Sequence, residues 1–176
     1  ESDFSGLKYN EFSFEHHVSP YVEPESHLPV YRWGDWGLLH NTVFLWARVD
    51  QAAGKVFIYD EFCRSGLVIE EICKVVKEKT GQTPIEWTVM DPSANRRDII
   101  TGRSVKDEFS RCGLFCVDGD RRGADNIGGR GVDIVKLMLK RGMIVISPRC
   151  KNLILELRNL QWGEKVGDDC TDALRY

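Results

Sequence analysis

Three short runs of β-branched and aromatic residues constrain the fold of this chain more than any other feature. They are Tyr31–Leu38, Thr42–Val49 and Lys55–Phe62, and only a few residues separate each run from the next. Consecutive strands joined by such short turns pair side by side in opposite directions. The sequence therefore predicts an antiparallel meander of three strands.

The rest of the chain alternates between helical and extended patterns. Apolar residues at helical spacing, ended by a glycine, predict helices that alternate with short apolar strands. In chain order the expected elements are a helix over Leu67–Thr80, a strand over Pro84–Met90, a helix over Ser104–Cys112, a strand over Leu114–Val117, a helix over Val132–Leu139, a strand over Met143–Ser147, a helix from about Arg149 and a last helix from about Asp168. This order predicts an α/β fold, with a mixed sheet and helices on both of its faces.

The length of 176 residues suits one domain and leaves little room for a second. Residues 1–30 contain Pro20, Pro24 and Pro29 and show no clear period, so we expect an extended lead-in, either a linker or a strap over the core. The domain itself is expected over residues 31–176. Because the chain starts without Met and without a signal-like segment, it is interpreted as a fragment of a longer protein.

The apolar runs and the cysteines exclude two other classes of protein. The longest apolar runs, such as Met143–Ile146, are far shorter than the roughly 20 residues needed to span a bilayer. The six cysteines form no C-x-x-C pair and lie far from the histidines, so we expect reduced thiols and neither a disulfide scaffold nor a zinc site.

The net charge of −3 hides an uneven distribution of charge along the chain. Residues 1–95 hold 8 Lys/Arg and 15 Asp/Glu, residues 96–151 hold 13 and 7, and residues 152–176 hold 3 and 5. The middle segment therefore carries +6 and could bind a polyanion such as nucleic acid. Solvated faces of two helices would explain the same charges.

Aspartates lie at three places where a carboxylate needs an explanation. Asp35 interrupts an apolar strand, and Asp91 ends another strand just before Pro92, where open α/β sheets place their functional sites. On the last helix, Asp172 lies three and four residues after Asp169 and Asp168, so the spacing places these acids on one face.

A cluster of like charges requires a cation, and carboxylate oxygens favour Mg²⁺ or Mn²⁺. Two such ions would suit phosphodiester hydrolysis, because one activates a water and the other stabilises the leaving oxygen. Each acid also has a simpler explanation by itself. Asp35 could lie in a hairpin turn, and Asp91, Asp168 or Asp169 could cap a helix.

The order of these motifs resembles the ribonuclease H-like nucleases, and more closely the nuclease domain of the large terminase subunit of tailed bacteriophages, from about residue 30 to the end. The resemblance depends on Trp33-Gly-Asp-Trp-Gly37, Val56-Phe-Ile-Tyr-Asp-Glu-Phe62, Val89-Met-Asp-Pro-Ser-Ala94, Cys150-Lys-Asn-Leu-Ile-Leu-Glu-Leu157 and Asp169-Cys-Thr-Asp-Ala-Leu-Arg-Tyr176. It implies an endonuclease that cuts concatemeric double-stranded DNA by a two-metal mechanism with little sequence specificity.

The resemblance also implies roles for single residues. Asp35 would be the ligand shared by both metals, and Asp91 and Asp172 would complete the site. Many relatives have His where this chain has Asp169, so the division of work among Asp168, Asp169 and Asp172 stays open. The three glutamates considered as further ligands or supports are Glu61, Glu70 and Glu71.

The basic middle segment then becomes a candidate DNA-binding surface. The residues proposed for phosphate contacts are Arg121, Arg122, Arg130, Arg96, Arg97 and Lys151. No G-x-x-x-x-G-K-[ST] motif occurs, so the ATPase that the resemblance implies would lie upstream of Glu1 in the same polypeptide. The portal and the small terminase subunit would be further partners, and the cytoplasm of the infected bacterial host the location. A junction resolvase, an RNA–DNA hybrid hydrolase and a non-catalytic DNA-docking domain are the alternatives.

Overall fold

A single six-stranded sheet forms the centre of the molecule in this computed structural model, which describes residues 6–20, 27–37, 39–119, 130–163 and 167–176. The strand order is β5-β4-β1-β2-β3-β6. The strands are β1 (Val30–Asp35), β2 (Thr42–Asp50), β3 (Lys55–Arg64), β4 (Ile85–Met90), β5 (Val117–Asp118) and β6 (Ile144–Ile146).

The expected meander is present, since β2 pairs antiparallel with both β1 and β3. The later strands add to its two edges in parallel: β4 beside β1, β5 beside β4, and β6 beside β3. The prediction of a mixed sheet, antiparallel first and parallel afterwards, is confirmed.

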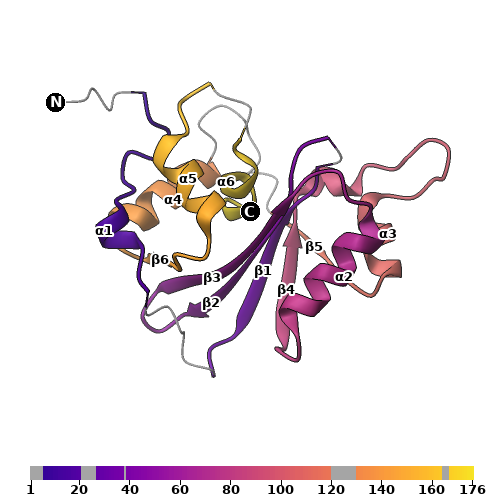
Figure 1. Cartoon of the computed structure of the whole chain (residues 1–176), viewed down its shortest axis with the longest axis horizontal. Coiled ribbons are helices and arrows are strands. Elements are labelled where there is room, and N and C mark those ends of the chain that lie inside the picture. The colour runs from indigo at the N-terminus through magenta and orange to yellow at the C-terminus, as the bar shows by residue number, and fades with distance from the viewer. Residues whose placement is uncertain (1–5, 21–26, 38, 120–129, 164–166) are drawn as a thin grey trace.

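Helices cover both faces of this sheet, as Figure 1 shows. On one face, α2 (Ile69–Thr80) and α3 (Val105–Arg111) enclose a core around Phe44, Trp46 and Phe109. The other face is covered by α4 (Arg130–Lys140), α5 (Lys151–Asn159) and α6 (Asp169–Leu174), whose apolar residues pack on Leu45 and Ile58 of the meander. The sheet is thus the middle of three layers.

Described residues of the lead-in pack against the second face. Tyr9 is buried in its core, and one turn of helix, α1 (Phe14–His17), follows. The buried His17 ring contacts the carbonyl oxygens of Ser13 and Leu139 through its two nitrogens, at 2.9 and 2.8 Å. Residues 6–20 therefore lie across the domain as a strap.

Element boundaries differ from the predictions at two places that matter. The first strand ends at Asp35 and does not continue to residue 38, so this aspartate lies at a strand end. The strand expected over Leu114–Val117 is Val117–Asp118, because Leu114 is buried and its N–H donates to the carbonyl oxygen of Phe109.

All six cysteines are free thiols. Within the described residues, no helix has the length and apolar character required for a membrane span.

Candidate functional site

Asp35 and Asp91 meet at the ends of two adjacent parallel strands. The backbone N–H of Asp91 donates to the carbonyl oxygen of Gly34 at 3.1 Å, which fixes the end of β4 beside the end of β1. Because side chains alternate along a strand, Asp35 shares the face of Trp33, which packs with the α4–α6 core. A Cβ at Gly34 would lie 2.8 Å from the Phe44 ring, so the close packing behind Asp35 requires glycine.

The short helix α6 brings further acids to these strand ends. It packs against β1 and β2, and its first turn carries Asp169 and Asp172. The N-terminus of α6 is capped by Glu156 of α5, whose carboxylate accepts from the N–H groups of Cys170 at 3.1 Å and Thr171 at 2.8 Å. A helix N-terminus favours a negative charge, so this contact fixes the position of α6.

Glu61 caps the start of α5 in the same way that Glu156 caps the start of α6. Its carboxylate, on β3, accepts from the N–H groups of Asn152 at 2.8 Å and Leu153 at 3.0 Å, at the start of α5. Glu61 is thus a structural residue that orients α5. The sheet positions α5, and α5 positions α6.

The four aspartates form one electrostatic cluster around Asp35. Burial raises the pKa of Asp35 to about 8, and the neighbouring carboxylates of Asp91, Asp172 and Asp169 add to the rise, whereas Arg175 opposes it. Asp35 retains only part of its exposure to solvent. The cluster therefore has more negative charge than its enclosed position favours, and a cation would relieve it.

Asp172 is the most enclosed of the acids contributed by α6. Burial raises its pKa to about 6, while Arg175 and Lys8 lower it. One carboxylate oxygen, Oδ2, accepts from Arg175 at 2.9 Å, and the other, Oδ1, is buried without a hydrogen-bond partner. A buried oxygen with a free lone pair is a candidate ligand atom.

Two further acids are held by polar neighbours. Asp91 accepts from the backbone N–H of Ser93 at 2.8 Å and from its hydroxyl at 2.7 Å, so it caps the 3₁₀-helix Pro92–Asn95, and its charge also raises the pKa of Asp35. Asp169 accepts from the Asn41 amide at 3.0 Å. The capping role considered for Asp91 and its place in the cluster are both realised.

Asp168 lies at the N-cap position of α6, but its side chain makes no capping hydrogen bond there. Its carboxylate lies 3.9 Å from the Lys8 ammonium group, which comes from the strap.

The donor set of the cluster fits a hard divalent cation, because every candidate ligand atom is a carboxylate oxygen. Among the described residues, however, no three carboxylates, imidazoles or thiols lie close enough together to hold a metal in their present positions. Asp91, Asp169 and Asp172 each accept a hydrogen bond from a polar neighbour, which is Ser93, Asn41 and Arg175 respectively.

Tyr176 is a neighbour of the cluster that sequence reasoning did not single out. Burial raises its pKa, and the charges of Asp91 and Asp35 raise it further. A Cβ at Gly119 would lie 2.8 Å from the Tyr176 Cβ, so this glycine admits the ring. Tyr176 also lines a mainly apolar cavity of about 320 Å³, together with Arg130 and Trp33.

The basic residues expected to contact DNA lie on several elements. Arg96 and Arg97 are exposed in the loop after the 3₁₀-helix, Arg130 begins α4, and Lys151 begins α5. Arg121 and Arg122 lie outside the described residues. Of the basic residues that the structure describes, Arg130 lines the same cavity as Tyr176, at the edge of the cluster.

Glu70 and Glu71 do not belong to this site. Both lie in the first turn of α2, which covers the face opposite to α6. Glu71 caps its own helix, since its carboxylate accepts from the N–H of Val68 at 3.1 Å.

Comparison with known proteins confirms the fold. No family model and no curated protein sequence matches the chain. Among solved structures, the large terminase from a thermophilic bacteriophage aligns with 97% of this chain at a TM-score of 0.78 and 21% identity. The P22 large terminase nuclease domain aligns with 98% of this chain and 90% of its own length, at a TM-score of 0.77 and 18% identity. The g2p large terminase nuclease domain of bacteriophage SPP1 was solved with bound Mn. It aligns with 91% of this chain and 93% of its own length, at a TM-score of 0.68 and 17% identity.

The chain therefore has the ribonuclease H-like fold of large terminase nuclease domains. It spans only 44% of the length of the terminase from the thermophilic bacteriophage.

Proposed function

We propose that this chain is the nuclease domain of a viral large terminase subunit, an endonuclease that cuts concatemeric double-stranded DNA during genome packaging. One observation supports this most strongly: in a terminase nuclease fold, Asp35, Asp91, Asp169 and Asp172 gather at the ends of β1 and β4 and on α6. Enclosed carboxylates of like charge are typical of catalytic sites that use cations.

In this proposal Asp35, Asp91 and Asp172 would be the catalytic residues and would hold two Mg²⁺ or Mn²⁺ ions. Asp35 would be a ligand of both, Asp169 would contribute a further carboxylate oxygen, and Asp168 would be the less central candidate. The bound ions would supply an activated water and charge stabilisation for the leaving 3′ oxygen. Binding of a divalent cation is supported by the unpaired Oδ1 of Asp172 and by the Mn in the SPP1 domain.

Other residues of the chain hold the acids and the substrate. Arg175 orients Asp172 through its Oδ2 atom, which leaves Oδ1 available. Arg130, Arg96, Arg97 and Lys151 would contact phosphates, as would Arg121 and Arg122. Phosphate contacts position a duplex without reading its bases, which suits cutting with little sequence preference.

The remaining partners follow from the role of a terminase. We propose an ATPase domain upstream in the same polypeptide, contacts with the portal and the small terminase subunit, and action in the cytoplasm of the infected bacterial host. This chain aligns with only 44% of the length of the terminase from the thermophilic bacteriophage.

Plasmid cleavage with Mn²⁺ or Mg²⁺ tests the proposal. We expect metal-dependent nicking by the wild type, and its loss in Asp35→Ala and in Asp172→Ala. Asp133→Ala, a matched change of an exposed acid on α4, should keep full activity. Cleavage that persists in both site variants would disprove the assigned site.

Substrate comparison separates the alternatives. Preferential cutting of a four-way junction or of an RNA–DNA hybrid would replace the terminase proposal with one of the other nuclease functions. Tight DNA binding without any cleavage would instead indicate a docking domain.

A further inference from the structure

Two adjacent isoleucines are fully exposed at the tip of the loop between β4 and α3. The side chains of Ile99 and Ile100 are 100% and 93% exposed. Single exposed apolar residues are common, but two large neighbours on one tip form a surface that favours a partner.

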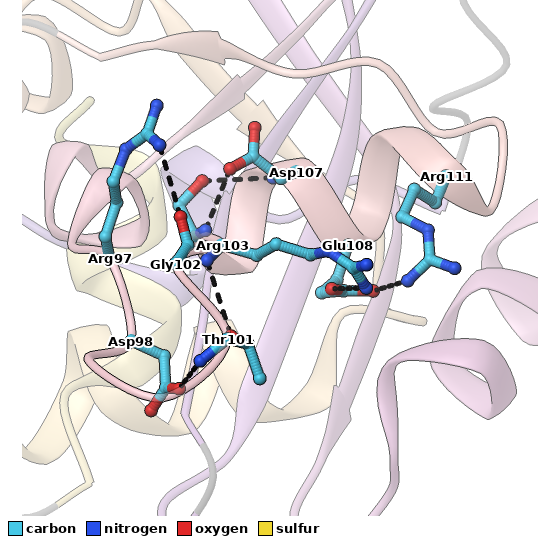
Figure 2. Close-up of polar contacts among 9 residues, drawn as sticks. Arg97, Asp98, Thr101, Gly102, Arg103, Asp107, Glu108 and Arg111 are labelled. Carbon is cyan, nitrogen blue, oxygen red and sulfur yellow. Dashed lines mark hydrogen bonds and ion pairs between the residues drawn. The ribbon is translucent and has the colours of Figure 1, made fainter.

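Polar contacts within the loop fix its shape. The N–H of Asp98 donates to the Arg103 carbonyl oxygen at 2.8 Å, and the N–H of Gly102 donates to the Asp98 carbonyl oxygen at 2.9 Å. Oδ1 of Asp98 accepts from the N–H groups of Ile100 at 3.0 Å and Thr101 at 2.8 Å, as Figure 2 shows for Thr101. The tip is held in place without burying either isoleucine.

Arginines surround the apolar tip. Arg96 and Arg97 precede it, and Arg103, which is ion-paired with Glu108 at 3.3 Å, follows it. Asp98, the acid within residues 96–103, is bound to backbone N–H groups. The Arg97 guanidinium also donates to the Gly102 carbonyl oxygen at 3.1 Å, across the base of the loop (Figure 2). An apolar tip with cationic flanks is complementary to a duplex, whose bases are apolar on their faces and whose backbone is anionic.

The loop also lies close in the chain to the candidate site. It follows Asp91 after the 3₁₀-helix, and the pairing of Arg97 with Ser104 closes its base. In Figure 1 it projects at the upper right, from the end of the sheet at which β4 finishes. A duplex bound at Asp91 would therefore extend toward this tip.

We propose that Ile99 and Ile100 form an apolar wedge that enters the groove of bound DNA and partly unstacks a base step near the cleavage site, with Arg96 and Arg97 on the adjacent phosphates. Aliphatic side chains act in this way in proteins that kink DNA, where unstacking is offset by a larger contact surface. The wedge rests on the proposed function, because it presumes a DNA duplex at Asp91.

A double substitution, Ile99→Ser with Ile100→Ser, removes the wedge but keeps the arginines and the loop contacts. Binding to a duplex that carries 2-aminopurine is followed by anisotropy at several salt concentrations, in an Asp35→Asn background that keeps the DNA intact. We expect affinity to fall about tenfold with an unchanged salt slope, because the slope counts phosphate contacts and the wedge makes none. The rise in 2-aminopurine fluorescence should disappear.

Two further variants serve as controls. Ile99→Leu with Ile100→Leu keeps an apolar tip and should restore both affinity and fluorescence. Leu155→Ser removes a leucine on α5 that is 60% exposed, and it should change neither. Because both isoleucines are exposed, the serine variant should fold normally, which circular dichroism checks.

The outcomes separate the wedge from the nuclease proposal. If the wild type cuts plasmid, and the serine substitutions change neither binding and unstacking in the Asp35→Asn background nor cleavage in the otherwise wild-type protein, the wedge is disproved and a protein partner becomes the better explanation of the tip. If the wild type cuts nothing but the serine variant loses affinity at constant salt slope, the wedge stands and the nuclease proposal fails.

Discussion

Replacing Asp35 by Asn should make the metal-free protein more stable. The pKa of Asp35 is raised from 3.8 to about 8 in the folded protein, so the folded state holds a proton that the unfolded state has released at neutral pH. Because pH 7 lies about 3 units above the unfolded-state pKa of 3.8, taking up this proton costs the folded state about 4 kcal/mol, at 1.36 kcal/mol per unit. Asn has nearly the same shape and carries no charge.

Part of this gain is lost because the buried amide needs partners of its own, which costs about 1–3 kcal/mol. We therefore expect a net increase of about 1–3 kcal/mol in the free energy of unfolding, or ~2–12 °C in Tm for a domain of this size. The sign follows from the raised pKa: stability of the wild type falls as pH rises from about 4 to about 8, and Asn removes that contribution.

Thermal unfolding with EDTA, followed by circular dichroism from pH 5 to 8, measures both effects. Asp133→Asn is the matched control, because it makes the same chemical change on an exposed face of α4. Excess Mn²⁺ should raise the Tm of the wild type and leave Asp35→Asn unchanged, because a ligand that binds only the folded state stabilises it. An Asn variant with unchanged or lower stability and the pH dependence of the wild type would refute the reasoning.

Three further predictions concern other residues of the domain. Glu156→Ala should leave N–H groups at the start of α6 without an acceptor, lowering the free energy of unfolding by about 1–3 kcal/mol and reducing cleavage, as urea unfolding and plasmid assays would show. Gly34→Ala should destabilise the domain by about 1–3 kcal/mol, because its Cβ would meet the Phe44 ring, and an unchanged Tm would contradict that packing. Arg121→Ala with Arg122→Ala should weaken duplex binding and flatten its salt slope, whereas an unchanged slope would remove both residues from the interface.

The fold was predictable because the signals that define it are local. Short turns between β-rich runs dictate antiparallel pairing, and the helical spacing after Leu67 continues to a glycine with φ +58° at position 81. Strand ends were less predictable. Asp35 reads as part of a longer apolar run, and only its pairing with Val43 and the neighbouring strand β4 shows where β1 stops.

Convergence of the acids was predicted from their order in the chain, but their supports were not. The contact between Asn41 and Asp169 joins residues 128 positions apart, and the contact between Glu61 and Asn152 joins residues 91 apart. No local pattern marks such pairs, because a polar residue in a turn or strand looks the same whether or not it caps a distant helix. Sequence reasoning missed Tyr176 for the same reason, since the position of this residue depends on the space left by the distant Gly119.

The two successive carboxylate caps have a consequence for how the site is assembled. Asp35 and Asp91 depend on the pairing of β1 with β4, whereas Asp169 and Asp172 depend on α6, which is held by Glu156 of α5, and α5 is held in turn by Glu61. The four acids therefore depend on two different sets of contacts. A formed sheet from which α6 had detached would hold only half of them.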